Sequence, residues 1–91
     1  MAFRFDRPIV IERFETFIQE LSAKEKVYRS KGIIAIAGNP RRAVFHGVNN
    51  RFTIFWDRLW EKAEARESQL VFIGKGLRRD AVEKSLTACL D

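Results

Sequence analysis

The sequence has very few of the side chains that build redox and metal centres. It contains one cysteine and one histidine among 91 residues. Cys89 has no second thiol in the chain for a disulfide, which agrees with a reducing compartment. A metal site needs several converging ligands, and neither residue belongs to a spaced pair of ligands. His46 and Cys89 remain candidate metal ligands, and their alternative roles are a strand histidine and a small buried thiol.

Catalytic motifs are also missing. Gly74-Lys75 follows an apolar run, but a phosphate-binding loop would need a glycine at position 69 and a hydroxyl at position 76. The sequence has Gln69 and Gly76 there. A nucleophilic triad would have to use the single histidine, and no serine has a local pattern that supports one. We therefore expect no catalytic residues, no bound cofactor and no enzyme activity in this chain.

Long apolar segments are absent as well. The longest apolar run, Ile33 to Ala37, has the length of a strand and falls far short of the ~20 residues that a membrane-spanning helix needs. The first residues, Met1 to Asp6, lack the apolar centre of a signal peptide. We expect a cytoplasmic protein with no membrane partner.

Positive charge exceeds negative charge, with 17 Lys and Arg against 12 Asp and Glu, a net charge of +5. Such a surface attracts nucleic acid, anionic lipid or an acidic protein. Lys31-Gly32 begins like the signature strand of RNA-recognition domains, but Ile33, Ala35 and Gly38 stand where that signature places stacking aromatics. A basic nucleic-acid-binding module is therefore the alternative function and not the favoured one.

The apolar spacing predicts an α+β protein. Apolar residues recur at helical spacing from Ile11 to Lys24, and again near the end of the chain, where Asp80 and Glu83 resemble a capping box. Short apolar runs predict strands near residues 3–5, 27–37, 43–48, 52–56 and 70–73, with a tight turn at Asn49-Asn50. The segment from Arg58 to Glu67 is a loop or a short helix.

The resulting order, β-α-β-β-β-β-α, favours a two-layer sandwich in which an antiparallel sheet of four to five strands has two helices on one face. We expect the Ile33–Ala37 run to be covered on both faces. Gly32 and Gly47 indicate a bulge or a close approach of another strand, and Gly74 and Gly76 suit a turn with positive φ. The last helix should bury Val82, Leu86, Cys89 and Leu90.

Three segments in this order resemble a known family. They are Tyr28-Arg29-Ser30-Lys31-Gly32-Ile33-Ile34, Val44-Phe45-His46-Gly47-Val48, and Arg66-Glu67-Ser68-Gln69-Leu70-Val71-Phe72-Ile73-Gly74, followed by a helix that ends in a cysteine. This series is similar to the C-terminal domain of CobW proteins, over essentially the whole chain. Trp60 fits the family's tryptophan, with Trp56 as a second candidate. His46 and Asn49 depart from it, because the family commonly has Gln and His there, and Arg78-Arg79-Asp80 replaces an acidic start.

The resemblance implies one domain, residues 1–91, of a metal chaperone that handles zinc, cobalt or the cobalamin pathway. In that family a separate N-terminal domain binds GTP, and that domain is absent from this sequence. The expected role is non-catalytic and regulatory, with the GTPase domain or a client metalloprotein as partner. The candidate interaction residues are Arg29, Lys31, Arg66, Trp56 and Trp60. The three basic residues would form a polar cluster at strand ends or pair with acidic neighbours.

Overall fold

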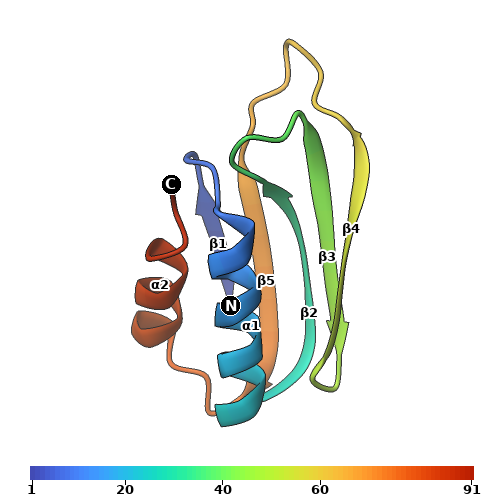
Figure 1. Cartoon of the computed structure of the whole chain (residues 1–91). Coiled ribbons are helices and arrows are strands. Elements are labelled where there is room, and N and C mark those ends of the chain that lie inside the picture. The colour runs from blue at the N-terminus through green and yellow to red at the C-terminus, as the bar shows by residue number, and fades with distance from the viewer.

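The sheet consists of five antiparallel strands in the order β1-β5-β2-β3-β4. The computed structural model describes residues 1–91, and both helices lie on the same side of the sheet (Figure 1). The order of elements confirms the predicted two-layer α+β fold. The elements are β1 (Ala2–Phe5), α1 (Ile11–Lys24), β2 (Lys26–Ala35), β3 (Arg41–Val48), β4 (Arg51–Leu59), β5 (Ser68–Lys75) and α2 (Arg79–Thr87).

Helix α1 forms over the predicted residues because its apolar side chains share one face. Phe14, Phe17, Ile18 and Leu21 are buried against the sheet, three or four residues apart. The helix ends where the N–H of Glu25 donates to the carbonyl of Leu21 at 2.9 Å. Neither helix has the length and hydrophobicity that a membrane-spanning segment requires.

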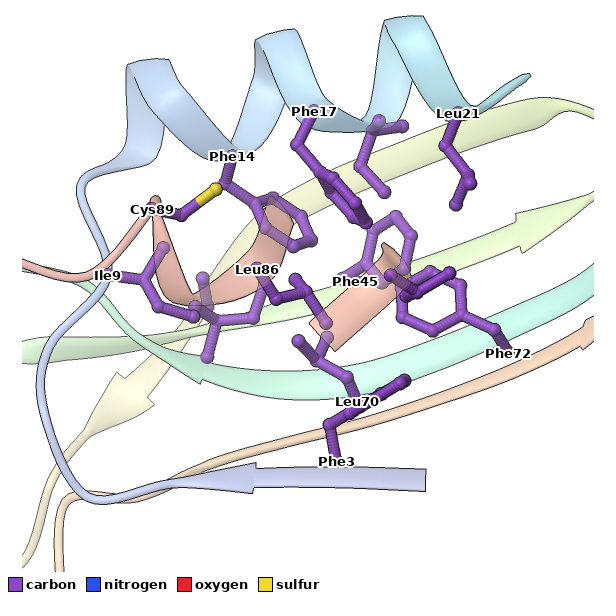
Figure 2. Close-up of a cluster of buried hydrophobic side chains, with 14 of the residues drawn as sticks. Phe3, Ile9, Phe14, Phe17, Leu21, Phe45, Leu70, Phe72, Leu86 and Cys89 are labelled. Carbon is purple, nitrogen blue, oxygen red and sulfur yellow. The ribbon is translucent and has the colours of Figure 1, made fainter. Parts of the chain in front are cut away.

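Phenylalanines fill the centre of the core between α1 and the sheet (Figure 2). Phe14 meets Phe45 edge to face with 5.2 Å between ring centroids, and Phe17 meets Phe72 in the same way at 6.1 Å. This geometry is the favoured one for aromatic pairs. Helix α2 adds the predicted apolar face, of which Val82, Leu86 and Cys89 are buried and Leu90 is half-buried.

The predicted cap of α2 is wrong. The helix begins at Arg79, its N-cap is Arg78, and no side chain bonds the first amides. Asp80 lies in the first turn, where its charge favours the helix dipole. The chain enters the helix early because Gly76, with φ of 76°, turns it sharply after β5, and Leu77 then packs against the core.

The β3–β4 hairpin has the predicted tight turn. Asn49 and Asn50 have φ of 50° and 63°, which is the left-handed pair of a two-residue type I′ turn. Gly47 allows the close approach expected of a strand glycine, because a Cβ there would lie 2.6 Å from Cδ1 of Phe52. The Phe52 ring instead stacks on Phe45, with 5.8 Å between centroids and 13° between planes.

The expectation that the Ile33–Ala37 run is covered on both faces is confirmed in its middle. Ile34, Ala35 and Ile36 are consecutive and all buried, and Ala35 lies on the side away from the helices, where it pairs with Arg42. At the ends of the run, Ile33 and Ala37 are half-buried.

The expectation of a turn at Gly74 is wrong. Gly74 does not form a turn, since it pairs with Val27 inside β5, and a Cβ at Gly74 would meet the backbone oxygen of Lys26 at 2.2 Å.

Strand β4 runs further than predicted and then leaves the sheet as a loop. A register shift near Arg42 places one extra residue on β4 between the pairs Ala43–Trp56 and Arg41–Leu59, which is a β-bulge. Residues 60–67 form a loop that projects beyond the end of the sheet (Figure 1). Arg58 fixes this loop by donating two hydrogen bonds to the carboxylate of Glu64, at 2.7 and 2.8 Å. These hydrogen bonds from Arg58 lower the pKa of Glu64 to about 2.

Ile9 ties the two ends of the chain together. It is fully buried, its N–H donates to the carbonyl of Ala35 at 2.8 Å, and its carbonyl accepts from Ala37 at 2.9 Å. The C-terminal residues pair beside it, with the N–H of Asp91 donating to the carbonyl of Pro8 at 2.9 Å. The connection between β1 and α1 is thereby held between the end of β2 and the end of the chain.

Candidate functional site on the open face of the sheet

The face of the sheet opposite the helices has no covering layer, and we call it the open face. Strand alternation and cross-strand register determine its composition. Its apolar residues are Ile33, Val44, Val48, Phe55, Val71 and Ile73. Its polar and charged residues are Arg4, Arg29, Lys31, Arg42, His46, Arg51, Thr53, Asp57 and Gln69. A sheet face that mixes these two kinds of residue is suited to contact with another surface.

The apolar residues of the open face are unusually accessible. Ile73 is 55% exposed, Phe55 47% and Val48 45%. Ile33 and Val44, both half-buried, sit side by side with Phe55, whereas Val48 and Ile73 flank Arg29 four residues further along their strands. Adjacent exposed apolar side chains on a small protein mark a contact surface more often than isolated ones do.

The charge of the open face is positive and only partly compensated. Arg42 pairs with Asp57 at 2.6 Å, and its hydrogen bond lowers the pKa of that carboxyl. Arg29, Lys31 and Arg51 take part in none of the ion pairs of the structure. Arg29 and Arg51 both flank Val48, on strands β2 and β4. Cations left without partners beside apolar groups complement an acidic surface with apolar residues.

The structure does not bring the predicted basic residues together. Arg29 and Lys31 lie on the open face in the middle of the sheet, whereas Arg66 lies in the β4–β5 loop. Arg66, Trp60 and Asp6 line a separate cleft of about 310 Å³ at one end of the sheet. Nε1 of Trp60 is buried and has no hydrogen-bond partner. The expected cluster of Arg29, Lys31 and Arg66 therefore does not form.

Trp56 lies on the helix side of β4, away from the open face. It is 43% exposed and lines a groove of about 590 Å³ between α1 and β4. The other groove residues from β4 are Phe52 and Ile54, and α1 contributes Ile11 and Ile18. The two candidate tryptophans thus belong to two different depressions.

The candidate metal ligands lie on opposite sides of the sheet. His46 is exposed on the open face, whereas Cys89 is buried at the end of α2, beside Phe14 (Figure 2). Burial raises the pKa of the Cys89 thiol, and Sγ donates to the carbonyl of Ser85 at 3.4 Å. No group of three or more His, Cys, Asp or Glu side chains is arranged to hold a metal ion.

Sequence reasoning missed three residues of the open face, namely Arg51, Phe55 and Ile73. Alternation within each strand was the signal that could have found them. Lys31 pairs with His46, and His46 pairs with Thr53, so the neighbours of Thr53 two residues away share its face. Without knowing which face the helices cover, however, alternation does not tell which set is exposed.

The fold defines the class of protein, an antiparallel sheet with two helices on one face and an uncovered surface on the other. The profile of the family described as "Cobalamin synthesis protein cobW C-terminal domain" matches residues 1–90. The chain therefore belongs to the CobW C-terminal domain family.

Two curated relatives are zinc chaperones. The chain is 37% identical over 90 residues to zinc chaperone CobW of Pseudomonas aeruginosa, covering 98% of this chain and 24% of that protein. It is 33% identical over 79 residues to zinc chaperone YjiA of Escherichia coli, covering 85% of this chain and 24% of that protein. The chain thus spans about a quarter of the length of these relatives.

Solved structures show the same fold. A crystal structure of zinc-bound YjiA GTPase from Escherichia coli superposes with a TM-score of 0.85 at 28% identity, over 100% of this chain and 29% of the other. A zinc-bound triple mutant of YjiA gives the same values.

Proposed function

We propose that this chain is the non-catalytic interaction and regulatory domain of a CobW-type, GTP-dependent metal chaperone of the cytoplasm. Its open face binds the GTPase domain or a client metalloprotein and couples that contact to the nucleotide state. The observation that carries the proposal is the set of exposed apolar residues on the open face, interspersed with the unpaired cations Arg29, Lys31 and Arg51. The zinc-chaperone relatives support metal trafficking as the setting.

The physical basis of such binding is the combination of two effects. Burial of Ile73, Phe55 and Val48 would supply the affinity, at roughly 25 cal/mol for each Å² of apolar surface removed from water. The cations would steer an acidic partner and set its orientation. A domain of this kind needs no reactive group, because it acts by holding the partner in one nucleotide state more tightly than in another.

Nucleic acid is less well supported as the partner. The unpaired cations of the open face would attract phosphates, but single-stranded nucleic acid also needs aromatic rings on which bases stack. The exposed aromatic residues outside the groove are Phe55 on β4 and Tyr28 at the bulge of β2, and the register places them well apart. Phe52 and Trp56 line the groove on the other side. A protein partner whose surface has both polar and apolar residues therefore fits the open face better than nucleic acid does.

The test is direct binding between this chain and a separately produced GTPase domain, for example that of the Pseudomonas aeruginosa relative. Calorimetry with GDP, with a non-hydrolysable GTP analogue and without nucleotide should show binding that differs between states. Lys31→Glu should weaken it about tenfold, which corresponds to ~1.4 kcal/mol. Lys84→Glu, the same charge change on exposed α2, is the matched control.

Absence of binding in every nucleotide state would refute the coupling to the GTPase domain. Equal losses of affinity for Lys31→Glu and Lys84→Glu would show that the net charge of the chain, and not its open face, is responsible for the binding. Tighter binding to single-stranded RNA, with an affinity that falls steeply with salt, would instead favour the nucleic-acid function.

A further inference from the structure

Strand β4 is a long, free edge of the sheet. It has nine residues, whereas the opposite edge strand, β1, has four. It contains no proline and no lysine, two of the residues that commonly protect such edges. Of the six large apolar residues that the structure exposes, three lie on β4: Phe55, Trp56 and Leu59.

The hairpin geometry tells which backbone groups of β4 face outward. The two-residue turn closes on the pair Val48–Arg51, which exchanges hydrogen bonds between the strands. Bonded and non-bonded pairs then alternate along the ladder. The N–H and C=O groups of Phe52, Ile54 and Trp56 therefore point away from β3, toward the free edge.

The side chains of these same three residues line the groove between α1 and β4. An added strand would thus form hydrogen bonds with the edge, and its alternate side chains would cover the mouth of the groove. Figure 1 shows β4 as the strand farthest from the helices, so neither helix blocks this approach.

We propose that the occupant of this edge is β4 of a second copy of the chain, paired antiparallel about a two-fold axis through Ile54. This register is self-complementary. On the helix side Phe52 faces Trp56 of the other copy, and on the open face Arg51 faces its Asp57. Opposite charges and aromatic pairs directly across a ladder both stabilise it. A shift of the axis by one residue would place Arg51 opposite Phe55 or Leu59 instead.

The charges near β4 also permit a copy to approach, despite the net charge of +5. Arg58 is compensated by Glu64 in a two-hydrogen-bond pair. Asp57 is paired with Arg42 of its own copy, so Arg51 is the one charge of the strand without an ion-pair partner, and it would share the carboxylate of the other copy's Asp57. The resulting dimer has a continuous ten-stranded sheet, and its two open faces lie side by side.

The test is the oligomeric state of the chain alone, which needs no GTPase domain. Sedimentation equilibrium from about 1 µM to about 1 mM should show a monomer–dimer equilibrium, since modest interfaces have dissociation constants in this range. Arg51→Asp places two like charges opposite each other and should weaken the dimer roughly tenfold. Arg29→Asp, the same change on the open face of β2, should leave it unchanged.

Cross-linking tests the register. Residues that face each other in a bonded pair have Cα atoms about 5.5 Å apart, which suits a disulfide. Ile54→Cys should therefore oxidise readily to a covalent dimer. Thr53→Cys should do so poorly alone but readily when mixed with Phe55→Cys, its partner in this register. Buried Cys89 does not compete.

A monomer over the whole concentration range would overturn the proposal. A dimer whose dissociation constant is unchanged by Arg51→Asp would also overturn it. So would a dimer that forms the disulfide more readily through Thr53→Cys than through Ile54→Cys. If β4 amides become protected from hydrogen exchange only when a GTPase domain is added, the β4 edge binds that domain, and pairing with a second copy of the chain is excluded. None of these results depends on whether the open face binds a partner.

Discussion

Replacing two phenylalanines on adjacent strands gives a matched test of which side of the sheet is the core. Phe45 is fully buried and contacts the rings of Phe14, Phe52 and Phe72. Phe45→Ala should cost about 3–5 kcal/mol, the usual range for a buried ring in which transfer and cavity terms add. A domain of 91 residues has a stability of about 5–14 kcal/mol, so the variant should fold but with little reserve.

Phe55 is 47% exposed on the open face and is the control. Phe55→Ala should cost about 1 kcal/mol or less, because most of its surface contact is with solvent and cross-strand neighbours. Urea unfolding followed by circular dichroism would measure both. With a slope of about 1.5 kcal/mol per molar urea, the Phe45 midpoint should fall by about 2–3 M and the Phe55 midpoint by less than about 1 M. Comparable losses would show that the open face is covered in solution, and the reasoning behind the candidate site would fail.

Three further outcomes follow from local contacts. Arg58→Ala should return the pKa of Glu64 from about 2 toward its ordinary value of 4.5, and titration of the carboxyl groups by NMR would measure this change. In the parent chain, the stabilisation by the Arg58–Glu64 pair is complete above pH 4.5 and is lost as the pH falls toward 2. Gly47→Ala should destabilise the domain by about 1–3 kcal/mol by overpacking against Phe52, with a smaller loss in a Phe52→Ala background. Cys89 should react with a thiol reagent only as fast as the core opens, because its side chain is buried and the reagent cannot reach it in the closed core. Fast labelling in native buffer would contradict its placement.

Much of the fold was predictable because hydrophobic periodicity is local. Helix α1 has the predicted ends, since Phe14, Phe17, Ile18 and Leu21 repeat at a period that only a helix satisfies. The Asn49-Asn50 turn was equally clear, because both residues accept positive φ. The order of the elements followed from the same apolar spacing, and the resemblance to the CobW C-terminal domain is confirmed over residues 1–90.

The candidate site was less predictable because it depends on tertiary arrangement. The Ile33–Ala37 run predicts burial but carries no information about which face the helices occupy, and Ile33 at its start is only half-buried. Arg66 appeared to belong with Arg29 and Lys31 because all three adjoin strands. The register places Arg66 in a loop near the end of β2, whereas Arg29 lies six residues earlier than Ala35, roughly 20 Å along the strand. The prediction that Asp80 caps α2 was wrong because the turn after β5 starts the helix at Arg79, one residue earlier.

The pairing of β1 with β5 has a consequence for how the protein is made. Of the strands of this domain, β1 leaves the ribosome first during synthesis, but its partner strand β5 appears last among the strands, with Ala2 opposite Val71. The β2–β3–β4 meander has only short connections and can form much earlier. Until Ser68–Lys75 emerges, the inner edge of β2 stays open as well as the outer edge of β4, and such intermediates are prone to aggregate. Chains arrested before β5 should therefore be the species that most need chaperones in the cell.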